Sequence, residues 1–226
     1  MESRPEARHA APRASAVARL RECLGWAGPP PPGSRPALII LAGLPGSGKS
    51  HLAAAIARQH PAAIVRSDQV RKLLFPQPQY TGAESGIVYL TCYALIEELL
   101  ADGYTVVFDA TNLTRESRRR ARACAERRGV PSLTLIAIAP EEVIEQRLRQ
   151  RHAGGAEPYF SDATWEVHRR LARRAELSLS PSEPGVLVDT SRDLERALAA
   201  VDRLLSSAPE RASPVPHSFP QQGPAA

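Results

Sequence analysis

The octapeptide Gly43-Leu44-Pro45-Gly46-Ser47-Gly48-Lys49-Ser50 fits the pattern G-x-x-x-x-G-K-[S/T] at every fixed position. It directly follows Ala37–Ala42, a short continuous apolar run typical of a buried strand. The helical pattern Lys49–Gln59 comes directly after it. In this order of strand, glycine-rich loop and helix, successive backbone N–H groups and the positive helix end face an anion. We therefore expect this octapeptide, the phosphate loop, to bind a nucleoside triphosphate.

The residue types in the phosphate loop suit that ligand. Glycines let the backbone adopt conformations closed to other residues and approach a phosphate closely. The Lys49 ammonium is expected to reach the β and γ phosphates, and the Ser50 hydroxyl to ligate Mg²⁺. His51 comes next and is interpreted as a residue of the helix surface. The expected nucleotide contacts are Gly43, Leu44, Pro45, Gly46, Ser47, Gly48, Lys49, Ser50 and the neighbouring His51.

Composition places the chain among ordinary folded proteins. It has 226 residues, a formal net charge of +5 and 43% hydrophobic residues. It lacks any run of about 20 apolar residues, the length that a membrane-spanning helix needs, so we expect no membrane segment. Cys23, Cys92 and Cys124 are too widely separated for a disulfide scaffold or a cysteine zinc site. This spacing favours a reducing compartment, and we expect a cytoplasmic protein.

Buried-strand patterns alternate with helical patterns over residues 37–205. The alternation predicts an α/β fold, a three-layer αβα domain with a mostly parallel five-stranded sheet. Residues 1–36 are expected to be disordered apart from a short helix near Ser15–Leu24, and residues 206–226 to form a disordered tail. The expected strands are Ala37–Ala42, Ala62–Arg66, Tyr104–Phe108, Leu133–Ala139 and Val186–Val188. The expected helices are Lys49–Gln59, Gln69–Leu74, Glu84–Ala101, Thr114–Arg128, Glu141–His152, Asp162–Leu179 and Leu194–Leu205.

Two classes of nucleotide-binding protein fit the sequence poorly. A GTPase needs an Asn-Lys-x-Asp motif to read guanine, yet the only lysine outside the phosphate loop is Lys72, in Arg71-Lys72-Leu73-Leu74. An ATPase motor needs a carboxylate beside its Mg²⁺ aspartate to activate water, but the candidate Asp109 is followed by Ala110. A kinase, which passes the phosphoryl group to an acceptor other than water, is favoured. An ATP-binding switch and an ATPase module that serves a partner remain as alternatives.

Asp68 is the best candidate for a catalytic carboxylate. It lies just past the expected strand Ala62–Arg66, and in parallel α/β sheets ligands bind beyond the carboxyl ends of the strands. Arg71 lies three residues on, on the same helical face. The carboxylate can accept the proton of an acceptor hydroxyl while the guanidinium holds the acceptor or its phosphate. A structural role is the alternative, because Ser67 or Asp68 also suits a helix N-cap.

Together these segments resemble a known family. The phosphate loop, Arg66-Ser67-Asp68-Gln69-Val70-Arg71 and Val107-Phe108-Asp109-Ala110-Thr111-Asn112 are similar to those of P-loop kinases that include polynucleotide 5′-hydroxyl kinases and zeta toxins, with an AAA-type ATP-binding kinase-like domain. The resemblance covers residues 37–205. It implies an ATP- and Mg²⁺-dependent transfer of the γ-phosphoryl group to a hydroxyl acceptor. It also implies that Asp68 is the general base and that Arg71 contacts the acceptor.

The same resemblance implies further roles. Asp109 falls at the strand-end aspartate of the family, near the acceptor or Mg²⁺. Glu141–His152 matches the start of a helical lid, in which Arg147 falls where the family keeps an arginine on the ATP phosphates. Arg151 lies one turn further on and is interpreted as a second lid arginine. Both precede the Gly154–Gly155 break, so that a closing lid would bring positive charge to the transferred phosphoryl group.

The identity of the acceptor stays open. Four arginines of the expected helix Thr114–Arg128 have the spacing i, i+3, i+4 and i+7 of a basic stripe, which could follow a nucleic-acid backbone or simply be a solvated face. The stripe has no interleaved aromatic residues on which bases could stack. A nucleic-acid end, a nucleotide sugar and a small hydroxylated metabolite all remain candidate acceptors. The four arginines are Arg115, Arg118, Arg119 and Arg122.

Overall fold

A computed structural model of the protein describes residues 10–152 and 163–208, with side chains described for residues 17–150 and 163–208. Across these residues strands alternate with helices. The strands are β1 Ala37–Ala42, β2 Ala62–Arg66, β3 Thr105–Asp109, β4 Ser132–Ile138 and β5 Gly185–Asp189. The helices are α1 Ala10–Cys23, α2 Lys49–Gln59, α3 Ser67–Leu74, α4 Gly82–Ala101, α5 Arg115–Arg128, α6 Glu141–His152, α7 Trp165–Ala172 and α8 Leu194–Ser207.

The five strands form one parallel sheet in the order β2-β3-β1-β4-β5. The expected α/β fold is confirmed, and the sheet is parallel throughout where we expected it to be mostly parallel. Because all strands run in the same direction, their carboxyl ends meet at one edge. The phosphate loop leaves β1 at the centre of that edge, which is where parallel α/β sheets bind their ligands.

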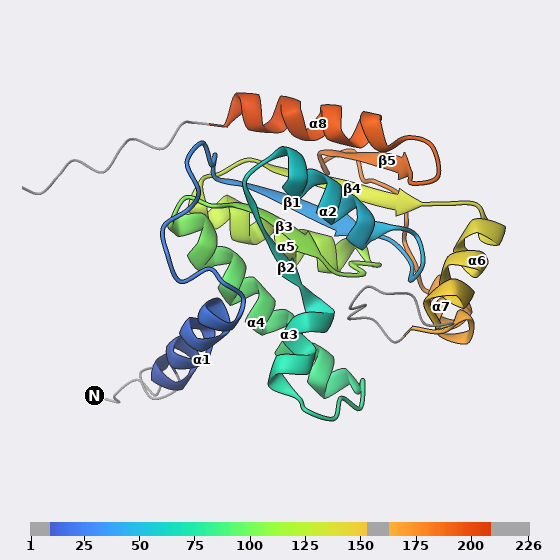
Figure 1. Ribbon diagram of the computed structural model, residues 1–226, viewed down its shortest axis with the longest axis horizontal. Helices are drawn as coiled ribbons and strands as arrows, with labels where there is room; N and C mark the ends of the chain where they lie inside the picture. Colours follow the sequence, from blue (N-terminus) through green and yellow to red (C-terminus); the bar gives the residue numbers. More distant parts are fainter. Residues whose placement is uncertain (1–9, 153–162, 209–226) are drawn as a thin grey trace, which may run out of the picture.

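The sheet separates two apolar cores. Successive residues of β1 point to opposite faces, so Leu38 and Ile40 join one core while Ile39 and Leu41 join the other. Residues of α4 and α5 complete the first core, and residues of α2 and α8 complete the second. Figure 1 shows the resulting layers, with α8 on one side of the sheet and α4 on the other. All six residues of β1 are buried, which is why its sequence is a continuous apolar run.

The described residues before the sheet differ from our expectation of disorder. Helix α1 covers Ala10–Cys23 and is longer than the expected Ser15–Leu24. Val17 and Leu20, one turn apart, are buried in the core beside α4. An Ala- and Arg-rich helix gives a weak amphipathic signal, and its order comes from this docking onto α4.

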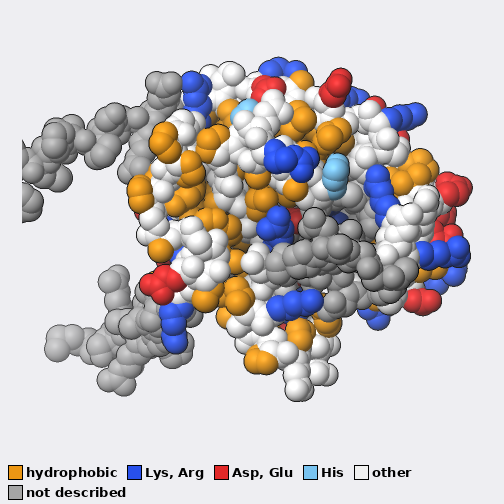
Figure 2. Space-filling view, in the orientation of Figure 1, with side chains coloured by type: hydrophobic (Ala, Val, Ile, Leu, Met, Phe, Trp, Pro, Cys, Tyr) orange, Lys and Arg blue, Asp and Glu red, His pale blue; other side chains and the backbone are white. Residues whose placement is uncertain are grey.

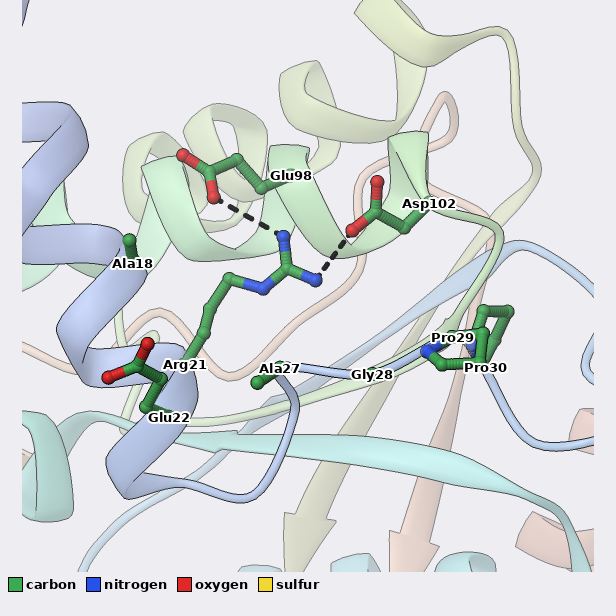
Figure 3. Close-up of a pocket in the computed structure, with 9 residues that line it drawn as sticks. All are labelled: Ala18, Arg21, Glu22, Ala27, Gly28, Pro29, Pro30, Glu98 and Asp102. Atoms are coloured by element: carbon green, nitrogen blue, oxygen red, sulfur yellow. Dashed lines mark hydrogen bonds and ion pairs between the residues drawn. The ribbon is translucent and has the colours of Figure 1, made fainter.

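Arg21 is the polar anchor of that docking. Its guanidinium pairs with Glu98 and Asp102 of α4 and also donates to the Trp26 carbonyl. Figure 3 shows Arg21 between the two carboxylates, in a cavity of about 430 Å³ that Pro29–Pro30 also line. The charge of Arg21 is therefore balanced within this contact, and α1 is fixed by both apolar and ionic contacts.

Helix α7 is shorter than the expected helix Asp162–Leu179, whose first residue lies outside the described residues. It begins after Thr164, whose side chain accepts the Val167 N–H at 3.4 Å. Beyond its end the backbone bonds elsewhere, and the Glu176 N–H donates to the Leu113 carbonyl at 2.7 Å. Helical periodicity cannot register such a bond to a distant segment, and that is why the sequence overestimates the helix.

Candidate active site

The phosphate loop keeps glycine where a side chain does not fit. Gly43 has φ +143°, and a Cβ there would collide with the Ala137 carbonyl oxygen at the end of β4. Gly48 has φ +91°, and its Cβ would lie 2.6 Å from Thr190 Oγ1, just beyond β5. Both positions need glycine for their backbone conformation and for close packing. The neighbouring strand ends therefore set the shape of the loop.

The loop runs into α2 through Lys49 and Ser50. The Lys49 side chain is buried, and its Nζ donates to the Leu44 carbonyl across the loop at 2.9 Å. Gly48 caps α2 without a side-chain hydrogen bond, and Ser50 and His51 are exposed in the first turn. A helix N-terminus with an ammonium group held over the preceding loop is suited to an anion.

Arg147 of α6 is held against the phosphate loop through Thr190. Its Nη1 donates to Thr190 Oγ1 at 2.8 Å, and its Nη2 donates to the Thr190 carbonyl at 3.2 Å. Thr190 Oγ1 in turn donates to the Ser47 carbonyl at 2.7 Å. The structure therefore places the Arg147 guanidinium beside the loop, whereas the side chain of Arg151 lies outside the described residues.

Asp68 and Asp109 lie at the carboxyl ends of neighbouring strands, at the same sheet edge. Arg66, at the end of β2, is in register with Asp109, at the end of β3, and Asp68 lies in the first turn of α3. Asp109 is 7% exposed, and its Oδ2 lies 3.8 Å from Arg66 Nε. The N-cap of α3 is Arg66, and it makes no side-chain cap hydrogen bond. The interpretation of Ser67 or Asp68 as an N-cap is therefore wrong.

The charge of Asp68 acts on buried groups of α4. Burial raises the pKa of the Cys92 thiol above its ordinary value, and the Asp68 carboxylate adds to this effect while Arg71 opposes it. Burial also raises the pKa of Tyr89, to which Asp68 makes a smaller contribution. The Tyr89 hydroxyl lies 3.2 Å from Thr111 Oγ1, in the loop that follows β3. Asp68, α4 and the loop that follows β3 therefore lie close to one another.

Arg71 is engaged by side chains from the start of α4. It is 6% exposed, with Nη1 3.4 Å from Glu84 Oε2 and Nη2 3.2 Å from Ser85 Oγ. Its guanidinium also lies over the Tyr80 ring, 4.9 Å from the centroid. Its Nε is buried and has no hydrogen-bond partner among the described residues. The charge of Arg71 is thus paired with Glu84, and its Nε–H is a donor without a hydrogen-bond partner among the described residues.

Asn112 joins the loop after β3 to the phosphate loop. It is fully buried with φ +43°, a conformation that Asn tolerates better than most residues. Its Nδ2 donates to the Leu41 carbonyl of β1 at 2.8 Å. One residue earlier, the Thr111 carbonyl accepts the Gly43 N–H at 2.9 Å. The start of the phosphate loop is thereby hydrogen-bonded to this loop.

The expected basic stripe on α5 loses one of its four arginines. Arg118 is fully buried, and its Nε donates to Glu183 Oε1 at 2.7 Å. The same guanidinium donates to the carbonyls of Glu176 and Ser178, each at 2.9 Å. Arg119 pairs with a glutamate of its own helix. Arg118 is turned inward and cannot contact a ligand, whereas Arg115, Arg119 and Arg122 stay on one face of α5, where Arg119 and Arg122 pair with Glu116 and Glu126.

Sequence reasoning assigned no role to three residues that contact the loops of this site. Thr190 and Asn112 each lie just beyond the end of a strand, and polar residues there were the signal that could have found them. His168 of α7 is buried, with Nδ1 2.8 Å from the Pro45 carbonyl and its ring stacked on Trp165. No sequence signal pointed to His168, because its partner Pro45 lies 123 residues earlier in the sequence.

Comparison with known proteins identifies relatives of the chain. The family AAA_33, described as an AAA domain, matches residues 38–178. An uncharacterised protein of Mycobacterium tuberculosis is 28% identical over 187 residues, which is 76% of this chain and 35% of that protein. The chain therefore spans about a third of the length of the curated relatives it matches.

Solved structures share the fold. Kti12 of Chaetomium thermophilum, in complex with ADP-AlF3, has a TM-score of 0.59 and 19% identity, over 74% of this chain and 98% of that chain. APS kinase CysC of Mycobacterium tuberculosis, in complex with AMPPNP and APS, has a TM-score of 0.56 and 20% identity, over 77% and 99%. At this identity the likeness shows the fold alone, a P-loop nucleotide-binding fold shared with kinases.

Proposed function

The chain belongs to the AAA_33 family of AAA domains, and from this premise we propose that it is a kinase that moves the γ-phosphoryl group of Mg·ATP to a hydroxyl acceptor. The observation that carries the proposal is the arrangement around the phosphate loop. Lys49 lies on the loop, and Arg147 is held on one side of it. On the other side, Asp68 lies just beyond β2 and Asp109 is the last residue of β3. This arrangement, with candidate phosphate-binding groups at the loop and candidate proton acceptors at neighbouring strand ends, supports the proposal.

ATP is proposed to lie with its phosphates in the phosphate loop. Backbone N–H groups and the Lys49 ammonium would hold the β and γ oxygens. The Arg147 guanidinium, fixed beside the loop by Thr190, would face the charge that spreads over the transferred group. Such groups accelerate transfer because they are in place before the charge develops.

Asp68 is proposed as the general base. As the acceptor oxygen bonds to the γ-phosphorus, the bond between that phosphorus and the β–γ bridging oxygen breaks and ADP leaves. The proton of the acceptor hydroxyl passes to the Asp68 carboxylate. The place of Asp68, in the first turn of α3 just beyond β2, supports this role.

Mg²⁺ fits the site through oxygen ligands. The described residues contain no group of three or more His, Cys, Asp or Glu side chains that could hold a metal, and Mg²⁺ bound with phosphates needs only one or two protein ligands. The exposed Ser50 hydroxyl and the Asp109 carboxylate are the candidates. When bound, the ion neutralises charge on the phosphate oxygens.

Transfer of labelled γ-phosphate from Mg·ATP tests the proposal. Acceptors would include a 5′-hydroxyl oligonucleotide, a nucleotide sugar and simple sugars, with ATP consumption expected only when an acceptor is present. Asp68→Asn is expected to slow transfer by about 10²–10⁴-fold while ATP binding, measured by calorimetry, changes little. Glu195→Gln, an exposed carboxylate of α8, is the control and should keep full activity.

Two outcomes would replace the kinase by another function. Equal ATP hydrolysis with and without acceptors would identify an ATPase module. ATP binding without any consumption would identify a switch. If transfer survives in Asp68→Asn, the kinase stands but its base lies elsewhere.

We also propose a reducing compartment, the cytoplasm. Cys23, Cys92 and Cys124 are all free thiols, and burial raises the pKa of Cys124 to about 12. A buried, protonated thiol is unreactive, so this cysteine has a packing role. Among the described helices none is both long and apolar enough to cross a bilayer.

A further inference from the structure

We propose that the acceptor is an uncharged polyhydroxy compound, and not a phosphorylated or carboxylated one, a conclusion that rests on the kinase function proposed above. The side chains that decide it lie beyond β2 and β3, on α3 and at the start of α4. We call them the acceptor wall. They are Arg66, Asp68, Arg71, Lys72, Glu84 and Asp109.

Arg71 is the cation best placed to hold an anionic acceptor, because it follows Asp68 by one helical turn. Its charge is already balanced by Glu84, and the two side chains are 7% and 13% exposed. Glu84 is itself fixed, since its Oε1 accepts the Gln79 N–H at 2.9 Å. An acceptor phosphate or carboxylate beside Arg71 would either displace Glu84 from its ion pair or lie next to the Glu84 carboxylate and be repelled by it, and both are unfavourable.

The rest of the acceptor wall is balanced as well. Arg66 lies 3.8 Å from Asp109, whose carboxylate is nearly buried. Lys72 is exposed on α3, one turn beyond Asp68. Arg66, Arg71 and Lys72 carry three positive formal charges and Asp68, Glu84 and Asp109 carry three negative ones, so the formal charges of the acceptor wall sum to zero. A balanced wall gives no electrostatic attraction to an anion and leaves hydrogen bonds to select the ligand.

One donor of the wall favours a hydroxyl. The Arg71 Nε–H is buried without a hydrogen-bond partner among the described residues, and such a donor gains from any oxygen that reaches it. A neutral hydroxyl oxygen can accept this bond without displacing Glu84. The nearby surface has few charges: Figure 2 shows hydrophobic and other uncharged side chains around a basic one on the arm formed by α3 and the start of α4, where Leu73 and Tyr80 are exposed.

Sulfate binding tests the charge of the wall without any turnover. The protein, with its phosphate loop filled by saturating Mg·ADP, is titrated with sodium sulfate by calorimetry at constant ionic strength. The wild type is expected to match Arg71→Gln, with no sulfate site that depends on Arg71. Glu84→Gln leaves the Arg71 charge unbalanced and is expected to bind sulfate at least about tenfold more tightly. Glu98→Gln, a carboxylate elsewhere on α4 that pairs with Arg21, is the matched control.

Sulfate binding by the wild type that disappears in Arg71→Gln would overturn the proposal. So would a Glu84→Gln variant that folds, as judged by its thermal unfolding, and gains no affinity for sulfate. Neither result depends on knowing the acceptor.

Matched acceptors provide the second arm. Thymidine is compared with thymidine 3′-monophosphate, and glucose with glucuronate, so that each pair keeps the same ring framework and the second member carries one added anionic group. The neutral member is expected to have a kcat/KM at least about tenfold higher. A higher kcat/KM for the charged member would overturn the proposal. If no acceptor promotes ATP consumption, the kinase function is the part in question, and the sulfate titration still decides the charge of the wall.

Discussion

Arg147 and Thr190 form a two-point contact beside the phosphate loop. The guanidinium donates to both the hydroxyl and the carbonyl of Thr190, at 2.8 and 3.2 Å. The same hydroxyl donates to the Ser47 carbonyl at 2.7 Å. One side chain at the end of β5 therefore sets the position of the proposed phosphate-binding arginine relative to the loop.

Replacing Thr190 by Val keeps its shape and removes the hydroxyl. We expect kcat to fall about 10–100-fold, because Arg147 would lose its orientation toward the transferred group. The affinity for ADP, which lacks that group, should change little. Steady-state transfer kinetics and ADP calorimetry measure the two effects. Thr190→Ser keeps the hydroxyl and should keep most of the rate, so an equal loss in both variants would contradict the role of the hydroxyl.

Replacing Asp109 by Asn tests its place as a metal ligand. The Mg²⁺ concentration for half-maximal transfer is expected to rise by about tenfold or more, because an amide oxygen carries no charge to offer the ion. Transfer rates over a Mg²⁺ titration measure this shift, with Ser50→Ala titrated beside it. An unchanged Mg²⁺ dependence would remove Asp109 from the metal site and leave it as the partner of Arg66.

The buried pair Arg118–Glu183 makes stability depend on pH. Burial alone would raise the pKa of Glu183, but the hydrogen bonds and charge of Arg118 outweigh burial and lower it. A lowered pKa in the folded state means that the stabilisation is complete above the unfolded value of about 4.3 and is lost as the pH falls through the folded value.

Replacing Glu183 by Gln should therefore lower the free energy of unfolding by about 3–5 kcal/mol at pH 7, because Arg118 stays buried without a counter-charge. The difference in the free energy of unfolding between variant and wild type should become smaller as the pH falls below about 4. Urea unfolding at a series of pH values from 7 to 3 measures it. A gap that stays constant over this range would show that the Glu183 carboxylate is not the source.

Helix α1 should contribute to the stability of the whole domain. Leu20 is 6% exposed in the core beside α4, so Leu20→Ala is expected to lower the free energy of unfolding by about 2–4 kcal/mol. Glu22, exposed on the same helix, provides the control, and Glu22→Ala should stay within about 0.5 kcal/mol. Equal effects of the two substitutions in urea unfolding would show that α1 does not share the core.

Sequence patterns located the elements between residues 37 and 205 with most ends within two residues. Strand Ala37–Ala42 and helix Lys49–Gln59 match to the residue, because apolar periodicity and glycine stops are local signals. The end of α7 was missed because the backbone after it forms turns and then bonds a distant carbonyl through the Glu176 N–H, which local periodicity does not reveal. Helix α1 was underestimated because its order comes from docking onto α4.

The candidate site divides in the same way. The phosphate loop and the carboxylates beyond β2 and β3 could be found, since a motif and the ends of strands mark them. Arg118 could not be interpreted correctly, because helical spacing does not reveal which arginine meets a buried carboxylate 65 residues away. The balance of Arg71 by Glu84 and the contact of Arg147 with Thr190 likewise depend on how the chain packs.

The buried Arg118 guanidinium also joins two segments of the chain by hydrogen bonds. Besides Glu183 it bonds the carbonyls of Asn112, in the loop after β3, and of Glu176 and Ser178, in the segment after α7. These two segments cannot shift independently without breaking buried hydrogen bonds. Since the loop after β3 also bonds Gly43, a continuous set of hydrogen bonds joins the segment after α7 to the first residue of the phosphate loop.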